Sequence, residues 1–257
     1  MRGFRETLAR NDEHARVVRI IALRTSDHDT TAGPMDIEQA RFNMVEQQIR
    51  PWYVLDQDVL DLLFVVHRED FVPPAYRALA FTDMEVPLDV DGERTGESML
   101  APKVEARLLQ HLELRKHETV LEIGAGSGHM AALLAHRGQR VHTYEINPTL
   151  AEFARANLRR AGITNVDVVT GDGAAFLKPG EETFDAIVLS GAVQFVPPVL
   201  FDRLNPGGRL IAIVGDEPVY SAQVFHKQGD RVTVPHNLFD TATKPLQGFP
   251  RRAAFAF

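Results

Sequence analysis

The sequence predicts an α/β protein in which an N-terminal helical cap precedes a doubly wound, mostly parallel sheet. The first observation is a β-branched and apolar run at 119–123, which leads through closely spaced glycines into an Ala/Leu-rich stretch at 130–135. This order is typical of a strand, a tight turn and a helix. The second observation is that strand-like and helix-like segments alternate after residue 101, whereas the segments before residue 67 have helical spacing.

The predicted cap consists of two helices, at 36–49 and 56–66, because apolar residues recur there at helical intervals. A short Arg/Pro/aromatic stretch at 50–53 separates them, and a loop is expected at 67–74. The next helix begins at Pro102, since proline is favoured in the first turn and apolar residues from Val104 onward follow on one face.

Strands and helices then alternate along the chain. A helix after the second strand is expected to have Asn147 as its cap, Pro148 at its first position and Gly162 at its end. A turn is predicted at 205–208, where the sequence is Asn-Pro-Gly-Gly. Beyond the strand of the glycine run, the expected strands are 140–145, 166–169, 184–189 and 209–214, followed by strand-like stretches at 223–226, 231–234 and 253–257.

Composition excludes several functional classes. The net charge of −7 argues against non-specific binding to nucleic acid or to an anionic membrane, and no apolar run approaches the ~20 residues that span a bilayer. The absence of cysteine excludes disulfides, thiolate zinc sites and cysteine nucleophiles, and is compatible with the cytoplasmic location that we expect. The histidines show no metal-ligand spacing, so no metal site is predicted.

Residues 1–34 differ from the rest of the chain. They carry several arginines and a polar run at 25–34, and their apolar residues are concentrated at 17–23. We therefore expect a disordered N-terminal extension, followed by a single domain at 35–257.

A nucleotide site is predicted at the carboxyl ends of the strands, where ligands bind in open α/β sheets. Glycines at 124, 126 and 128 would let the backbone pass close to a nucleotide. The spacing G-x-G-x-G lacks the third glycine of a dinucleotide fingerprint, which favours S-adenosylmethionine over NAD. Glu145 closes the second strand and is suited to a ribose diol, while Glu122 and Asp172 are further acids near strand ends.

Several motifs resemble class I S-adenosylmethionine-dependent methyltransferases, namely V-L-E-I-G-A-G-S-G, Y-E-I-N, G-D-G and L-N-P-G-G-R-L. The upstream stretches M-V-E-Q-Q-I-R and R-E-D-F-V-P are similar to those of protein-L-isoaspartate O-methyltransferases. This resemblance implies a seven-stranded Rossmann-like sheet, with 35–100 as the cap and substrate-side segment and 101–257 as the cofactor-binding core. The residues implied for the cofactor are Glu122, Gly124, Gly126, Ser127, Gly128, Glu145, Ile146, Asp172 and Gly173.

The same resemblance implies methylation of isoaspartyl carboxylates in proteins or peptides, with two departures on the substrate side. Aligning Ala101-Pro102 with the family places Leu100 at the position of its usual serine and Ser98 at that of its threonine, so these two residues are the catalytic-side candidates. The stretch 190–193 replaces a T-A-A-P-like turn. Two alternatives remain: a methyltransferase of the same fold with a different acceptor, and a non-catalytic protein that binds S-adenosylmethionine.

Overall fold

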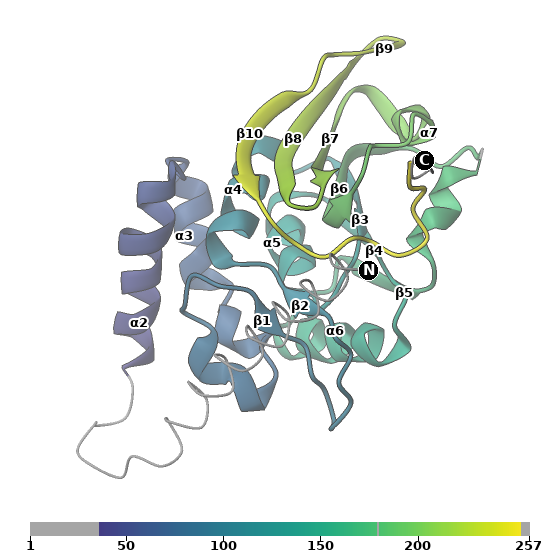
Figure 1. The fold of residues 1–257 in the computed structure, drawn as a ribbon. Helices are drawn as coiled ribbons and strands as arrows, with labels where there is room; N and C mark the ends of the chain where they lie inside the picture. Colours follow the sequence, from purple (N-terminus) through teal and green to yellow (C-terminus); the bar gives the residue numbers. More distant parts are fainter. Residues whose placement is uncertain (1–35, 179, 253–257) are drawn as a thin grey trace.

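The computed structural model describes residues 36–178 and 180–252, and it confirms the predicted α/β class. Seven strands form the main path of one sheet in the order β10-β8-β7-β6-β3-β4-β5, with β9 paired to β8. The five strands from β7 to β5 run parallel, and β8 and β10 are antiparallel. Figure 1 shows the N-terminal helices beside the sheet rather than within its layers. The expected extension at 1–34 lies outside the described residues.

The predicted cap helices are present, and both begin at an aspartate cap. Asp36 accepts a hydrogen bond from the backbone N–H of Gln39, and Asp56 accepts from the N–H of Asp58. The first helical run is α-helical only in its first half and then widens into a π-helix, and the expected loop at 67–74 contains a 3-10 turn. The elements are α2 Ile37–Asn43, π-helix Met44–Ile49, 3-10 turns Arg50–Trp52, Arg68–Asp70 and Pro74–Leu79, α3 Gln57–Val65, and the short strands β1 Val86–Pro87 and β2 Ser98–Met99.

The parallel part of the sheet follows the predicted alternation. Asn147 caps α6 through hydrogen bonds from the N–H groups of Thr149 and Leu150, and Gly162 adopts a positive φ of 69° just after the helix. The elements are α4 Pro102–Leu112, β3 Thr119–Ile123, α5 His129–Arg137, β4 Arg140–Glu145, α6 Pro148–Arg160, β5 Val166–Thr170, the 3-10 turn Gly173–Leu177, β6 Phe184–Val193, α7 Val199–Asp202 and β7 Leu204–Asp216.

The predicted turn at 205–208 is instead a bulge within β7. Phe184 pairs with Leu204 and Ala186 with Arg209, so β7 takes three more residues than β6 over the same span. The C-terminal strands β8 Val219–Gln228, β9 Arg231–Val232 and β10 His236–Thr241 complete the sheet. Strand β8 is longer than the stretch predicted at 223–226, β10 was not predicted, and the stretch at 253–257 lies outside the described residues.

Side chains that alternate along the strands form two separate apolar cores. On β3, Val120 belongs to the larger core with α4, α5, α6 and the cap, whereas Leu121 and Ile123 belong to the smaller one. Strand β7 divides in the same way, since Ile211 contributes to the larger core and Leu210 to the smaller. One face of the sheet is therefore covered by long helices, and the other mainly by short helical turns.

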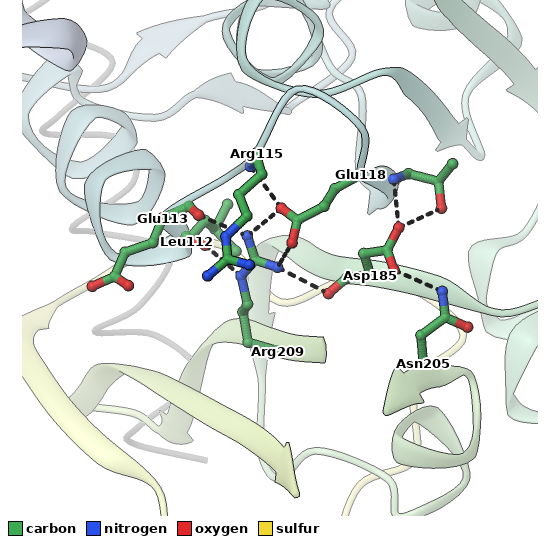
Figure 2. A network of polar contacts seen from close by, with 8 residues as sticks. Leu112, Glu113, Arg115, Glu118, Asp185, Asn205 and Arg209 are labelled. Carbon is green, nitrogen blue, oxygen red and sulfur yellow. Dashed lines mark hydrogen bonds and ion pairs between the residues drawn. The ribbon is translucent and has the colours of Figure 1, made fainter. Parts of the chain in front are cut away.

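A buried arginine holds α4 to the amino edge of the sheet (Figure 2). The two terminal nitrogens of Arg209 donate to the two carboxylate oxygens of Glu118, at 2.7 and 2.6 Å, and Arg209 also donates to the backbone carbonyls of Leu112 and Glu113. Asp185 accepts from the N–H of Thr119 at 2.8 Å. This network lies at the edge opposite the glycine run, so it supports the fold without contributing to the candidate site.

Candidate active site

The glycine run forms a tight turn between β3 and α5. Gly124, Gly126 and Gly128 have φ values of 99°, 53° and 83°, which side chains with a Cβ rarely adopt. The N–H of Gly124 donates to the carbonyl of Tyr144 on β4 at 2.8 Å. A Cβ on Gly128 would lie 3.2 Å from the Cβ of Ala154, so this glycine also permits close packing of α5 against α6. The sequence therefore needs glycine at all three positions for local reasons.

A cleft that is partly open to solvent lies at the carboxyl ends of the central strands. It occupies the place where ligands bind in open α/β sheets. The structure brings seven of the predicted site residues to its walls: Ser98, Gly124, Gly126, Glu145, Ile146, Asp172 and Gly173. Together they include two of the three loop glycines and two of the three predicted acids.

Glu145 is the acid best placed to bind a polar ligand in this cleft. It is the last residue of β4, and its side chain accepts hydrogen bonds from the N–H of Gly126 at 2.8 Å and of Asn147 at 3.0 Å. Burial raises the pKa of Glu145, while these backbone donors oppose that shift. Each carboxylate oxygen has about two acceptor sites, so the side chain can still accept from a ligand diol.

The other predicted acid, Glu122, lies beneath the cleft rather than in its walls. It is fully buried within β3, between β4 and β6. Its carboxyl group accepts hydrogen bonds from the hydroxyls of Thr143 at 2.7 Å and Ser190 at 2.8 Å. Burial raises the pKa of Glu122 to about 8, so the group is mainly protonated at neutral pH.

Three further predicted residues are also absent from the walls of this cleft. Ser127 is buried, where its hydroxyl accepts from the N–H of His129, and Gly128 packs against α6. Leu100 is 6% exposed, and its side chain belongs to the larger core. Only its backbone is engaged in polar contacts, since its carbonyl accepts from Arg68 at 2.6 Å.

A buried charged network stabilises the substrate-side segment around Leu100. Arg68 also donates to the carbonyl of Ala80 at 3.1 Å and pairs with Glu105 on α4. His129, which directly follows the glycine turn, contacts the same carboxylate through Nδ1 at 2.9 Å. His129 is therefore a packing and hydrogen-bonding residue in the interior, and it does not line the cleft.

Ser98 is the predicted catalytic-side residue that does reach the cleft. It lies on β2, and its hydroxyl donates to Glu85 at 2.6 Å. Because a hydroxyl oxygen also has acceptor capacity and its proton can rotate, this contact leaves Ser98 able to bind another group.

One wall of the cleft was not predicted from the sequence. The segment 243–247 returns from β10 across the sheet edge, as the yellow end of the chain shows in Figure 1. Its backbone pairs with the end of β6, because the N–H of Ala192 donates to the carbonyl of Lys244 and the N–H of Leu246 donates to the carbonyl of Ala192, both at 2.8 Å. The segment has no apolar periodicity, so its sequence contained no signal for this position.

Across 36–178 and 180–252, no group of three or more His, Cys, Asp or Glu side chains is arranged to hold a metal ion. Within the same ranges, no helix is both long and apolar enough to cross a membrane.

The comparisons with known proteins agree on one family. A family model described as protein-L-isoaspartate(D-aspartate) O-methyltransferase matches residues 39–247. A protein-L-isoaspartate O-methyltransferase of Methanoculleus marisnigri is 41% identical over 196 residues, which cover 76% of this chain and 86% of the relative. One from Aeropyrum pernix is 38% identical over 196 residues, which cover 75% and 73%.

Solved structures agree with the fold. A protein-L-isoaspartate O-methyltransferase structure superimposes with a TM-score of 0.68 at 26% identity, covering 82% of this chain and 66% of the other. A structure from Plasmodium falciparum, described as a putative enzyme of this type in complex with S-adenosyl-L-homocysteine, has a TM-score of 0.67 at 20% identity and covers 80% and 97%. The glycine turn, the strand-end carboxylate and the matched length lead to one conclusion: the chain belongs to the protein-L-isoaspartate(D-aspartate) O-methyltransferase family.

Proposed function

We propose that this protein transfers a methyl group from S-adenosylmethionine to the α-carboxylate of isoaspartyl residues in proteins or peptides. The proposal rests on the open cleft, because the glycine turn and Glu145 meet in its walls and the chain belongs to this family. Its relatives named protein-L-isoaspartate O-methyltransferase are 34–41% identical over about three quarters of the chain.

The walls of the cleft fit S-adenosylmethionine. The glycines at 124 and 126 leave backbone without side chains beneath the ligand, and Glu145 has acceptor capacity for both ribose hydroxyls. Asp172 and Gly173, just after β5, supply a polar wall for the adenine. A dinucleotide pyrophosphate would instead call for the longer glycine fingerprint, which this turn lacks.

Methyl transfer to a carboxylate needs little acid–base chemistry from the protein. The acceptor has a pKa near ~4 and is already ionised at neutral pH, so no general base is required. The bound cofactor supplies a methyl group activated by a sulfonium. Transfer of this methyl group to the carboxylate oxygen would break the S–CH₃ bond and leave its electron pair on sulfur. The task of the chain is therefore to hold the acceptor oxygen in line with the methyl group and to exclude water.

The acceptor side of the cleft supports a second candidate, a methyltransferase of the same fold with a different acceptor. The resemblance around Ala101-Pro102 implies that Leu100 stands at the position of the family's usual serine, and the side chain of Leu100 is buried in the core. Ser98 is then the hydroxyl available to an acceptor on this segment. We propose that Ser98 takes part in acceptor binding. We also propose that turnover of isoaspartyl peptides is slow, because Leu100 provides no hydroxyl at the position of the usual serine.

The test is methylation of paired peptides that differ only in an isoaspartyl or an aspartyl residue. With labelled S-adenosylmethionine, we expect base-labile label only on the isoaspartyl peptide, and less of it with Ser98→Ala. Binding of S-adenosylhomocysteine, measured by calorimetry, should be unchanged in Ser98→Ala. A wild-type protein that binds this ligand but labels neither peptide would favour the different acceptor. A protein that does not bind it at all would contradict both enzyme functions.

A further inference from the structure

We propose that Lys244 binds the carboxylate of the methyl acceptor through its ammonium group. This inference rests on the proposed function and assigns that function an acceptor-binding residue. The walls of the cleft carry three acidic residues, Glu97, Glu145 and Asp172. Within the part of the chain that the structure describes, Lys244 is the one lysine or arginine lining this cleft.

An anionic acceptor needs such a cation because the other charged groups oppose it. Three carboxylates around one cleft create a potential that repels a further carboxylate. The substrate-side segment supplies one hydroxyl, from Ser98, and that hydroxyl already donates to Glu85. Leu100 does not line the cleft, since its side chain is buried in the core and its carbonyl binds Arg68. The ammonium of Lys244 is the remaining charged donor in the walls.

Two hydrogen bonds to Ala192 on β6 hold the backbone of the segment around Lys244 in place. The carbonyl of Lys244 accepts from the N–H of Ala192, and two residues later the N–H of Leu246 donates back to Ala192. The side chain of Leu246 packs over the glycine turn, where its Cδ2 lies 3.1 Å from the site of a Cβ on Gly124 and 2.8 Å from that on Gly191. The segment that carries Lys244 is therefore anchored to the end of β6 and to the cofactor turn.

The side chain of Lys244 extends from this anchor toward the substrate-side segment. Its ammonium donates to the backbone carbonyl of Gly96, two residues before Ser98. No ion pair in the described ranges involves Lys244, whereas Lys103, for example, pairs with Asp83. An ammonium has three donors, so Lys244 can keep the contact with Gly96 and bind an acceptor carboxylate as well.

Carboxylates from two sources can reach this cleft: that of the acceptor and that of the methionine part of the cofactor. The contact with Gly96 places the ammonium beside the segment that carries Ser98, which favours the acceptor. Measuring the affinity for S-adenosylhomocysteine, which retains the methionine carboxylate, separates the two sources.

The test compares Lys244→Met and Lys244→Arg with wild type, and uses Lys116→Met as a control of equal charge change on the exposed loop after α4. We expect Lys244→Met to raise the KM for an isoaspartyl peptide about tenfold, with kcat and the Kd of S-adenosylhomocysteine changed less than about twofold. Lys244→Arg should restore most of the loss, since it keeps the charge. Lys116→Met should behave as wild type.

Three results would overturn the inference, and they are distinguishable. An unchanged KM in Lys244→Met, with wild type active, would remove Lys244 from acceptor binding and leave the proposed function intact. A weakened affinity for S-adenosylhomocysteine with an unchanged KM would assign Lys244 to the cofactor carboxylate. A wild-type protein without isoaspartyl methylation would overturn the proposed function, and this inference with it.

Discussion

Replacing Glu122 by glutamine should make the stability of this protein less dependent on pH. Glu122 is fully buried in β3, and burial raises its pKa to about 8 from an ordinary value of 4.5. Glutamine has the shape of the protonated acid and can exchange hydrogen bonds with the hydroxyls of Thr143 and Ser190. The variant therefore keeps the packing of the neutral group and removes its ionisation.

The direction of this pH dependence follows from the number of protons that the folded and the unfolded protein bind at Glu122. Between about pH 4.5 and 8 the folded protein keeps a proton on Glu122 that the unfolded chain has released. The free energy of unfolding is therefore greatest below the unfolded pKa and decreases as the pH rises toward the folded one. At ~1.4 kcal/mol per pKa unit, the full difference is at most about 5 kcal/mol, and between about pH 5.5 and 7.5 it is about 2 kcal/mol.

The assay is urea denaturation of wild type and Glu122→Gln at several pH values in that range. We expect the free energy of unfolding of wild type to fall by about 2 kcal/mol relative to the variant as the pH rises. Glu181→Gln, the same change at an exposed side chain, is the control and should follow wild type. Parallel curves for wild type and Glu122→Gln would show that the two states bind equal numbers of protons at Glu122, and would refute the reasoning.

Three further predictions concern the site, the scaffold and the chain end. Glu145→Gln should weaken binding of S-adenosylhomocysteine at least about tenfold in calorimetry, because one amide oxygen must replace two that accept from Gly126 and Asn147; unchanged affinity would exclude Glu145 from the site. Arg209→Met should lower the free energy of unfolding by about 3–5 kcal/mol, since it leaves Glu118 buried without its partner. Arg140→Met, at an exposed pair, should cost less than about 1 kcal/mol, and equal losses would contradict the role of burial. A chain beginning at Met35 should keep the melting temperature and cofactor affinity of the full chain, and a drop of several degrees would show that the extension packs on the domain.

Local sequence patterns were sufficient for most elements of the fold. The glycine turn, the asparagine cap and the strand–helix alternation depend on residues close together in the chain, so their signals could be recognised without the structure. The turn expected at 205–208 failed because the same Pro-Gly-Gly chemistry also suits a bulge. The pairing of Ala186 with Arg209, which determines the outcome, is not encoded locally.

The sequence predicted some residues of the site correctly and misplaced others. That Glu145 would reach the cleft followed from its place at the end of a strand. Glu122, also expected there, lies deeper because β3 continues to Ile123 and the hydroxyls of Thr143 and Ser190 hold its carboxyl group inside the sheet. The class of fold, the family and the cofactor turn could thus be predicted from the order of the amino acids. The burial of Leu100 in the core and the return of Lys244 to the cleft could not be predicted, because both depend on contacts between residues far apart in the chain.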